Sequence, residues 1–282
     1  MPSPNKPQPA ISVNYWAITF MAATVLMITM GARQSLGLFV SPLNTATGLG
    51  LTAISFAMAV GQFTWGAIQP VAGAVADKYG PGRVLATGLV LLAVGLAITP
   101  MLSSEAGLMV SLGLLSAAGA GAGSLSVLIG TVAQRIPDDK RGMASGVINA
   151  GGSFGQFVFA PTMQKINSST GHAYAFFTLA VLTLLAMPLA YLLRRQRNPI
   201  EKSATSAAIV STVTLNAQVV GALKDRSYLL LHAGFFTCGF HIAFLVVHLP
   251  GEVQVCNLPP SVARWSIAII GSANIVGSLL AG

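Results

Sequence analysis

The sequence predicts an all-α protein that crosses a membrane several times. Only 8% of its 282 residues are charged, whereas 54% are hydrophobic. A helix that spans the ~30 Å hydrocarbon core of a bilayer needs about 20 predominantly apolar residues. Helices also satisfy their own backbone hydrogen bonds, which lipid cannot do. We therefore predict eight membrane-spanning helices, at about 15–42, 53–76, 83–103, 106–134, 142–165, 173–193, 227–250 and 263–282.

The basic residues between these segments gather on one side of the predicted membrane. They lie near the N-terminus and in the loops after the second, fourth and sixth segments, whereas the opposite loops contain only Lys165 and Arg264. Because basic loops tend to stay in the cytoplasm, we expect a multi-pass protein of the cell (inner) membrane with a cytoplasmic N-terminus. The net charge of +8 then reflects orientation and contact with anionic lipid headgroups. It does not indicate a nucleic-acid partner.

A long hydrophilic stretch divides the predicted helices into a group of six and a group of two. We expect a cytoplasmic tail at 1–14, a six-helix bundle at 15–193, a cytoplasmic connector at 194–226 and the start of a second bundle at 227–282. The connector carries many charges and suits the inner surface of a membrane, where a short surface helix is compatible with it.

The beginning of the second bundle resembles the beginning of the first. Gly31-Ala32-Arg33 and Gly239-Phe240-His241 are 208 residues apart, and in each case a proline follows nine residues after the last residue named. A parallel repeat of six helices is a known plan for transporters. We therefore expect eight helices of a twelve-helix protein that is truncated at its C-terminus, with a natural eight-helix protein as the alternative.

The loop between the second and third segments carries the most specific motif. It reads Gly-Ala-Val-Ala-Asp-Lys-Tyr-Gly-Pro-Gly-Arg over residues 73–83. Gly73 is expected to allow two helices to approach closely, and Gly80 with Pro81 to form a tight turn. Asp77 is placed to pair with nearby bases or to face the positive end of another helix.

This motif resembles the cytoplasmic signature of the major facilitator superfamily, with one basic position replaced by glycine. The resemblance implies that the protein is a transporter with that family's fold. It also implies a gate on the cytoplasmic side rather than a substrate site at this loop. The expected gate residues are Gly73, Asp77, Lys78, Gly80, Arg83 and, from a second loop at 137–142 that also resembles the family, Arg141.

Glycines are frequent within the predicted fourth and fifth helices. Gly119, Gly121 and Gly123 could in principle form a dinucleotide-binding loop, but such a loop needs a preceding strand. These glycines lie in the middle of a predicted span, so we expect them to allow close helix packing. The glycines four residues apart in 142–165 are expected to do the same.

Arg33 is the one basic residue within a predicted span, and charged groups at such depth are costly and usually functional. An arginine keeps its charge and can hold a carboxylate by two parallel hydrogen bonds. Its surroundings, Gly31 to Ser35 with Gly37 and Phe39, resemble the first helix of bacterial monocarboxylate and oxalate carriers. The alternative is that Arg33 reaches to the outer membrane surface, since it lies 18 residues, or ~27 Å, from Tyr15.

Other polar residues within the spans predict an internal site. His241 occupies the repeat position of Arg33, and a histidine can bind an anion or take up a proton. Pairs of amides lie seven residues apart and so share a helix face. The predicted substrate-binding residues are Arg33, His241, Gln62, Gln69, Asn149, Gln156 and Asn274. For each amide and for His241, the alternative is a bond between packed helices.

No acidic residue lies inside a predicted span, so the site is expected to be positive. We predict a monomeric secondary transporter of a small organic anion, such as a monocarboxylate, that works by alternating access and is coupled to a proton or counter-anion. The alternatives are an exporter of drugs or other hydrophobic compounds and a membrane receptor or sensor. The spacing of His232, His241 and His248 suits neither a metal site nor a catalytic pair. We therefore expect no enzyme activity, no cofactor and no metal, and no disulfide between the two cysteines.

Overall fold

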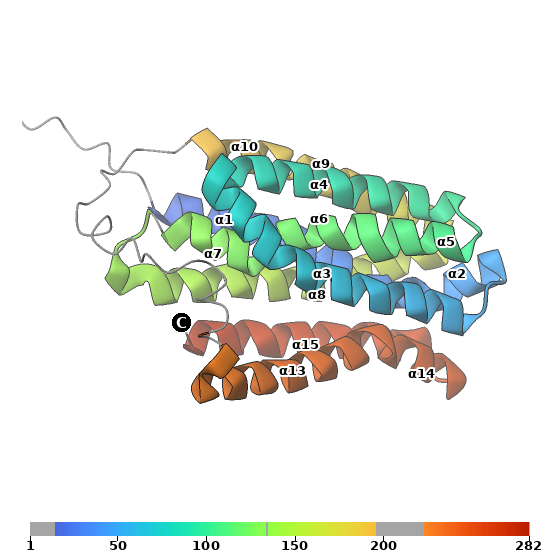
Figure 1. Ribbon diagram of the computed structural model, residues 1–282. Helices are drawn as coiled ribbons and strands as arrows, with labels where there is room; N and C mark the ends of the chain where they lie inside the picture. The colour runs from blue at the N-terminus through green and yellow to red at the C-terminus, as the bar shows by residue number, and fades with distance from the viewer. Residues whose placement is uncertain (1–14, 134, 196–220, 222, 282) are drawn as a thin grey trace, which may run out of the picture.

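The structure is a computed structural model that describes residues 15–133, 135–195, 221 and 223–281. The predicted tail at 1–14 and most of the predicted connector at 194–226 lie outside these residues. The described parts consist of helices joined by short turns and contain no strand. Figure 1 shows long helices that run side by side along one direction, with short helices and turns at the two ends. This arrangement confirms the predicted all-α fold.

The first part of the chain, up to Arg195, forms a bundle of helices that pack around two apolar clusters. Its elements are α1 (Tyr15–Gln34), η1 (Leu36–Phe39), α2 (Val40–Thr47), α3 (Leu51–Tyr79), α4 (Pro81–Ile98), η2 (Thr99–Met101), α5 (Glu105–Leu108), the π-helical η3 (Met109–Ser116), α6 (Ala117–Ala122), α7 (Leu125–Ala133), η4 (Asp138–Lys140), α8 (Arg141–Thr170), α9 (His172–Leu185) and α10 (Met187–Arg195). The second part contributes α13 (Arg226–Val247), α14 (Leu249–Val255) and α15 (Pro260–Ala281). These three helices lie beside the bundle as a separate group, with α15 packed against α8.

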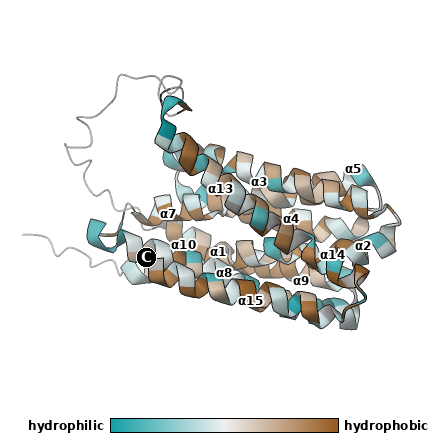
Figure 2. Ribbon diagram, turned by 90° about the horizontal axis from the view of Figure 1, so that it is seen from below, coloured by the Kyte–Doolittle hydropathy of each residue, from teal (hydrophilic) through white to brown (hydrophobic). Residues whose placement is uncertain are grey.

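Six helical stretches of the described chain are both long and apolar enough to cross a membrane. They are Tyr15–Thr47, Leu51–Tyr79, Pro81–Met101, Glu105–Ala133, His172–Leu193 and Ser261–Leu280. The two other predicted spans correspond to α8 and α13, which have 30 and 22 residues and so have the length of a span. Figure 2 shows that apolar residues prevail along the helices. Large apolar side chains such as Phe63, Phe236 and Leu280 point outward, as expected for a surface that faces lipid.

Glycines bring α1 and α8 into direct backbone contact. A Cβ atom added to Gly151 would lie 2.6 Å from the carbonyl oxygen of Ala23, and one on Gly155 would collide with that of Met27. The same register continues four residues later, where Gly31 of α1 meets the ring of Phe159. These contacts confirm that small residues in the predicted fifth helix allow close packing. Gly119 likewise lies against the backbones of Gly88 and Leu92 in α4.

The described residues do not show the close approach predicted at Gly73, because a Cβ atom added at this position would meet no atom of a neighbouring element among them within 4 Å. Gly73 lies six residues before the end of α3 and is partly buried. The expected turn at Gly80 is confirmed. Gly80 has a φ of +93°, a conformation that favours glycine, and Pro81 begins α4.

The first predicted span is not one continuous helix. After Gln34 the chain forms the short turn η1 and then α2, which extends the segment to Thr47. The second part of the chain follows the same order, with α13, a break at His248 and then α14. Moreover, α14 begins 209 residues after α2, and α15 begins 209 residues after α3. The order and spacing of these helices support the repeat predicted from sequence.

Candidate functional site

A cavity of about 750 Å³ lies between the bundle and the second group of helices. Its lining comes from α1, α3, α7, α8, α13 and α15, among others. Five of the seven predicted substrate-binding residues line it: Arg33, Gln62, Gln69, Asn149 and Asn274. Residues far apart in the sequence therefore converge on one space of the size that small-molecule sites have.

The Arg33 side chain points into this cavity and is held on two sides. Its guanidinium carbon lies 4.0 Å from the centre of the Trp65 ring, an attractive cation–π geometry. Its Nη2 atom donates a hydrogen bond to Oε1 of Gln62, on the same helix as Trp65. Arg33 therefore faces α3 and the cavity, and its depth relative to the membrane surface stays a prediction. Arg33 turns inward because α3 offers both a ring and an amide oxygen at this depth.

A second polar group on α3 lies seven residues further along, at Gln69. Its Oε1 accepts a hydrogen bond of 2.9 Å from the hydroxyl of Ser126 in α7. The Ser126 hydroxyl is in turn 3.0 Å from the hydroxyl of Ser124, which lies in the turn that interrupts the helix between α6 and α7. The break is tied to α1 because the Thr29 hydroxyl donates to the carbonyl oxygen of Gly123 at 3.1 Å. The Arg33 and Gln69 groups thus belong to one connected wall.

Asn149 joins the two groups of helices across the cavity. Its amide nitrogen donates a hydrogen bond of 2.7 Å to the hydroxyl of Ser278 in α15. Gln156, seven residues after Asn149 in α8, lies opposite Gly271, seven residues before Ser278 in α15. The two helices are therefore antiparallel in a fixed register, and Asn149 is a residue of the interface as well as of the cavity.

The bond between Asn149 and Ser278 gives a direct prediction about stability. Asn149→Ala, Ser278→Ala and the double variant should each lose about the same unfolding free energy, with a coupling of about 0.6 kcal/mol, the mean for such bonds in membrane proteins. Unfolding of the purified protein in SDS-containing micelles measures these values. Strictly additive losses would contradict a bond between these side chains.

Two predicted residues lie elsewhere. Gln156 is only 1% exposed and does not line the cavity, because Gly271 allows α15 to cover it. His241 has an exposed side chain and is also absent from the lining. The face of α13 that meets the cavity carries Phe235, Gly239 and Ile242, and each helical residue turns by about 100° from the last. His241 therefore points to a different side from its neighbour Ile242.

Several lining residues are absent from those predicted by sequence, notably Trp65, Ser126 and Ser278. Trp65 follows Gln62 by three residues and precedes Gln69 by four, so helical spacing alone places it on the same face. Ser126 and Ser278 carry no comparable signal, because serines occur on every face of these helices. The indole nitrogen of Trp65 is buried and has no hydrogen-bond partner among the described residues.

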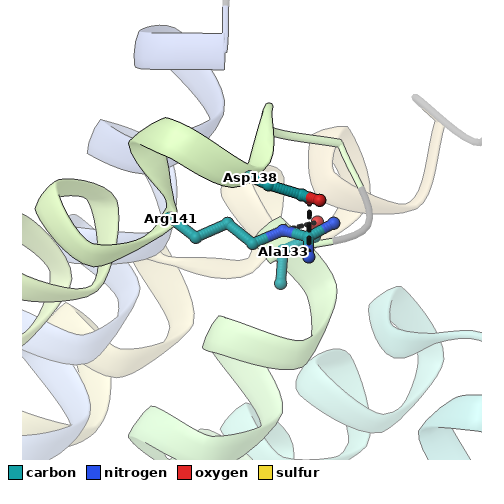
Figure 3. Close-up of polar contacts among 3 residues, drawn as sticks. All are labelled: Ala133, Asp138 and Arg141. Carbon is teal, nitrogen blue, oxygen red and sulfur yellow. Dashed lines mark hydrogen bonds and ion pairs between the residues drawn. The ribbon is translucent and has the colours of Figure 1, made fainter.

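The predicted gate residues make local contacts. Arg141 donates from Nε to the carbonyl oxygen of Ala133 at 3.0 Å and pairs with Asp138 at 2.8 Å, as Figure 3 shows. It thereby caps the end of α7. The Lys78 amine lies 5.2 Å from the centre of the Tyr79 ring, and no basic side chain of the described chain lies within ion-pair distance of Asp77. A gate at these residues stays a prediction.

Arg135 adds a further contact at the same end of the bundle. Its Nη2 donates to the carbonyl oxygen of Leu193 at 3.0 Å, near the end of α10. Burial among these helices lowers the pKa of the Arg135 guanidinium. Among the residues that the structure describes, no three metal-ligating side chains come together.

Comparison with known proteins gives one family and several relatives. The family model described as the Major Facilitator Superfamily matches residues 20–282. The oxalate:formate antiporter of Oxalobacter formigenes is 27% identical over 249 residues, which are 86% of this chain and 58% of the relative. Monocarboxylate transporter 13 of Rattus norvegicus is 24% identical over 95% of this chain and 60% of its own length. The fujikurins efflux protein of Gibberella fujikuroi is 25% identical over 76% and 44%.

Among solved structures, a D-xylose-proton symporter shares the fold. It matches with a TM-score of 0.64 and 17% sequence identity, over 93% of this chain and 66% of that chain. The chain thus spans about three fifths of the length of the first two relatives.

Proposed function

The chain belongs to the Major Facilitator Superfamily, and from this premise we propose that it carries a small organic anion across a membrane as a secondary transporter. Its helices indicate a multi-pass membrane protein, and its family and relatives point to a transporter rather than an enzyme. The proposal extends this to the class of substrate, to the residue that binds it and to the way the protein moves.

The observation that carries the proposal is the inward position of Arg33. Among the described residues that line the cavity, Arg33 is the one with a formal charge. An uncompensated charge within a membrane protein is costly, so it is retained where a ligand or partner neutralises it. Gln62 and Trp65 hold the guanidinium in place while leaving further N–H groups free to donate to a carboxylate.

The mechanism that we propose is alternating access. The group of α13 to α15 would rock against the bundle around the cavity, with α8 and α15 as the contact between the two. Opening towards either side would break few polar contacts, because the Asn149–Ser278 bond is the one side-chain hydrogen bond between the described parts of these two helices. We place the end that carries Lys78, Arg83 and Arg141 in the cytoplasm, with the 73–83 loop as the gate on that side. The coupled species is a proton or a counter-anion.

The names of two relatives support an organic anion as substrate, since one is an oxalate:formate antiporter and another a monocarboxylate transporter. A second candidate function is export of hydrophobic compounds. It is favoured by the many apolar residues of the lining, such as Met30, Leu112 and Phe235, and by the relative named as an efflux protein. Arg33 distinguishes the two, because a hydrophobic neutral or cationic compound gives it no counter-charge.

Matched pairs of acids and amides test the proposed function. The full chain would be purified, inserted into lipid nanodiscs and titrated with radiolabelled lactate, acetate, oxalate and formate, and with lactamide and acetamide. We expect saturable binding of at least one acid and at least tenfold weaker binding of its amide, because only the acid supplies a charge to Arg33. Equal binding of acid and amide, or binding of a lipophilic cationic dye without binding of any acid, would contradict the proposal.

A further inference from the structure

We propose that the transported anion is elongated, with its carboxylate at Arg33 and a hydrogen-bond acceptor at its other end, at Gln69. This inference rests on the proposed function and specifies the class of substrate more closely. It predicts that medium-length acids with a distal carbonyl or hydroxyl oxygen bind more tightly than plain fatty acids of the same length.

The two ends of the proposed site are set by one face of α3. Gln62, Trp65 and Gln69 all line the cavity and are spaced by three and four residues, so they succeed one another along that face. Seven residues of helix separate Gln62 from Gln69, which corresponds to ~10 Å along the axis. Because Gln62 holds Arg33, the same length separates the cationic end of the wall from its amide end.

The hydrogen bonds at the Gln69 end have a direction. The Ser126 hydroxyl has one proton, which it donates to Oε1 of Gln69. The 3.0 Å contact between Ser124 and Ser126 must then be a bond from Ser124 to Ser126. The chain of donors ends at the Gln69 oxygen. The amide nitrogen of Gln69 remains, and the described residues offer it no hydrogen-bond partner.

A ligand at this end therefore needs to accept a hydrogen bond. The two N–H groups of the Gln69 amide are donors, so they fit a carbonyl, ether or hydroxyl oxygen and not a methyl group. A polar group that a ligand desolvates without offering it a hydrogen-bond partner weakens binding. A plain fatty acid of the same length would desolvate the Gln69 amide in this way, whereas an oxo acid would accept a hydrogen bond from it.

The wall between the two ends is apolar. Trp65 lies between Gln62 and Gln69 on α3, and Met30 of α1 with Leu125 and Ile129 of α7 add apolar side chains to the cavity lining. If a hydrogen bond of ~3 Å is formed at each end, about 4 Å of the ~10 Å separation remain for the ligand itself. An extended chain of a few methylene groups has this length and suits the apolar middle.

The test compares acids of equal length and charge that differ only in the distal oxygen. The full chain in nanodiscs would be titrated by calorimetry with 4-oxopentanoate against pentanoate and 5-oxohexanoate against hexanoate. In the wild type we expect the oxo acid of at least one pair to bind about fivefold to tenfold more tightly. In Gln69→Leu this preference should vanish, while the plain acid binds as well as before or better. Gln164→Leu, the same change on α8 outside the cavity, should keep the wild-type preference.

Each other outcome has a defined meaning. If oxo and plain acids bind equally in the wild type, or if Gln69→Leu keeps the preference, the elongated substrate is excluded, while the proposed anion transport stands as long as binding requires Arg33. If neither type of acid binds more tightly than its amide analogue, the proposed function itself fails. Ser126→Ala provides a second variant. It removes the hydrogen bond that holds the Gln69 oxygen, so the preference for an oxo acid over the plain acid should fall to less than threefold. An unchanged preference would contradict the role of the hydrogen bonds from Ser124 through Ser126 to Gln69.

Discussion

Arg33→Gln is expected to weaken the binding of an organic anion by about 10- to 100-fold, because a hydrogen-bonded charge at the site is replaced by a neutral amide. Arg33→Lys should recover part of the loss, since it restores the charge but not the planar pair of donors. Trp65 and Gln62 hold the guanidinium from one face and one edge, and a lysine amine cannot satisfy both contacts at once. Equilibrium binding of a labelled acid in nanodiscs measures the affinities of the wild type and of both variants.

Arg226→Gln is the matched control for this experiment. Arg226 begins α13, is exposed and does not line the cavity, so its loss should leave anion binding within twofold of the wild type. Equal affinity of the wild type and Arg33→Gln would remove Arg33 from the site. A large loss in Arg226→Gln would show that the net charge of the protein, rather than a particular cavity residue, governs binding.

The second large effect concerns stability. Gly119→Ala should lower the unfolding free energy by about 1–3 kcal/mol, the usual cost of forcing an extra methyl group into a packed interior. The added Cβ atom would collide with the backbone of Gly88 and Leu92, and a backbone cannot turn aside as a side chain can. The helices α4 and α6 would have to separate. The temperature of unfolding in detergent, followed by intrinsic fluorescence, reports the change.

Gly73→Ala is the control, and its expected effect has the opposite sign. Gly73 lies within α3 and an added Cβ atom there meets nothing within 4 Å. Alanine is favoured over glycine in a helix by up to ~1 kcal/mol, so this variant should be as stable as the wild type or more stable. Equal destabilisation by both substitutions would mean that each helix itself requires glycine, and that the contact between α4 and α6 does not explain the effect of Gly119→Ala.

Sequence alone predicts the order and approximate extent of the long helices, because an uninterrupted apolar segment has few structures open to it in lipid. It does not predict the break after Gln34. There, the segment from Ser35 to Phe39 forms a 3₁₀ turn. Gly37 within it and Pro42 just after it weaken a continuous helix, but neither fixes where the break falls. The contact expected at Gly73 is not seen among the described residues, and sequence could not decide it for a related reason. A glycine permits close approach, but only a neighbouring helix can make use of it.

The site shows the same limit in more detail. Spacing by seven residues correctly indicates that Gln62 and Gln69 share a face, and both line the cavity. The same spacing relates Asn149 to Gln156, yet only Asn149 lines it. Periodicity reports which residues share a face, but not what covers each part of that face. At Gln156, Gly271 lets α15 approach closely and fill the space that the cavity occupies further along.

The composition of α8 has a consequence for how the protein is made. With Asn149, Gln156 and its many glycines, α8 is not among the stretches apolar enough to cross a membrane unaided, although it has the length to do so. It is also the helix on which both α1 and α15 pack. A nascent segment of this kind gains little from partitioning into lipid by itself. Its insertion during synthesis should therefore depend on α1 already being in place beside the translocation channel, so that assembly of the bundle and entry of α8 are a single event.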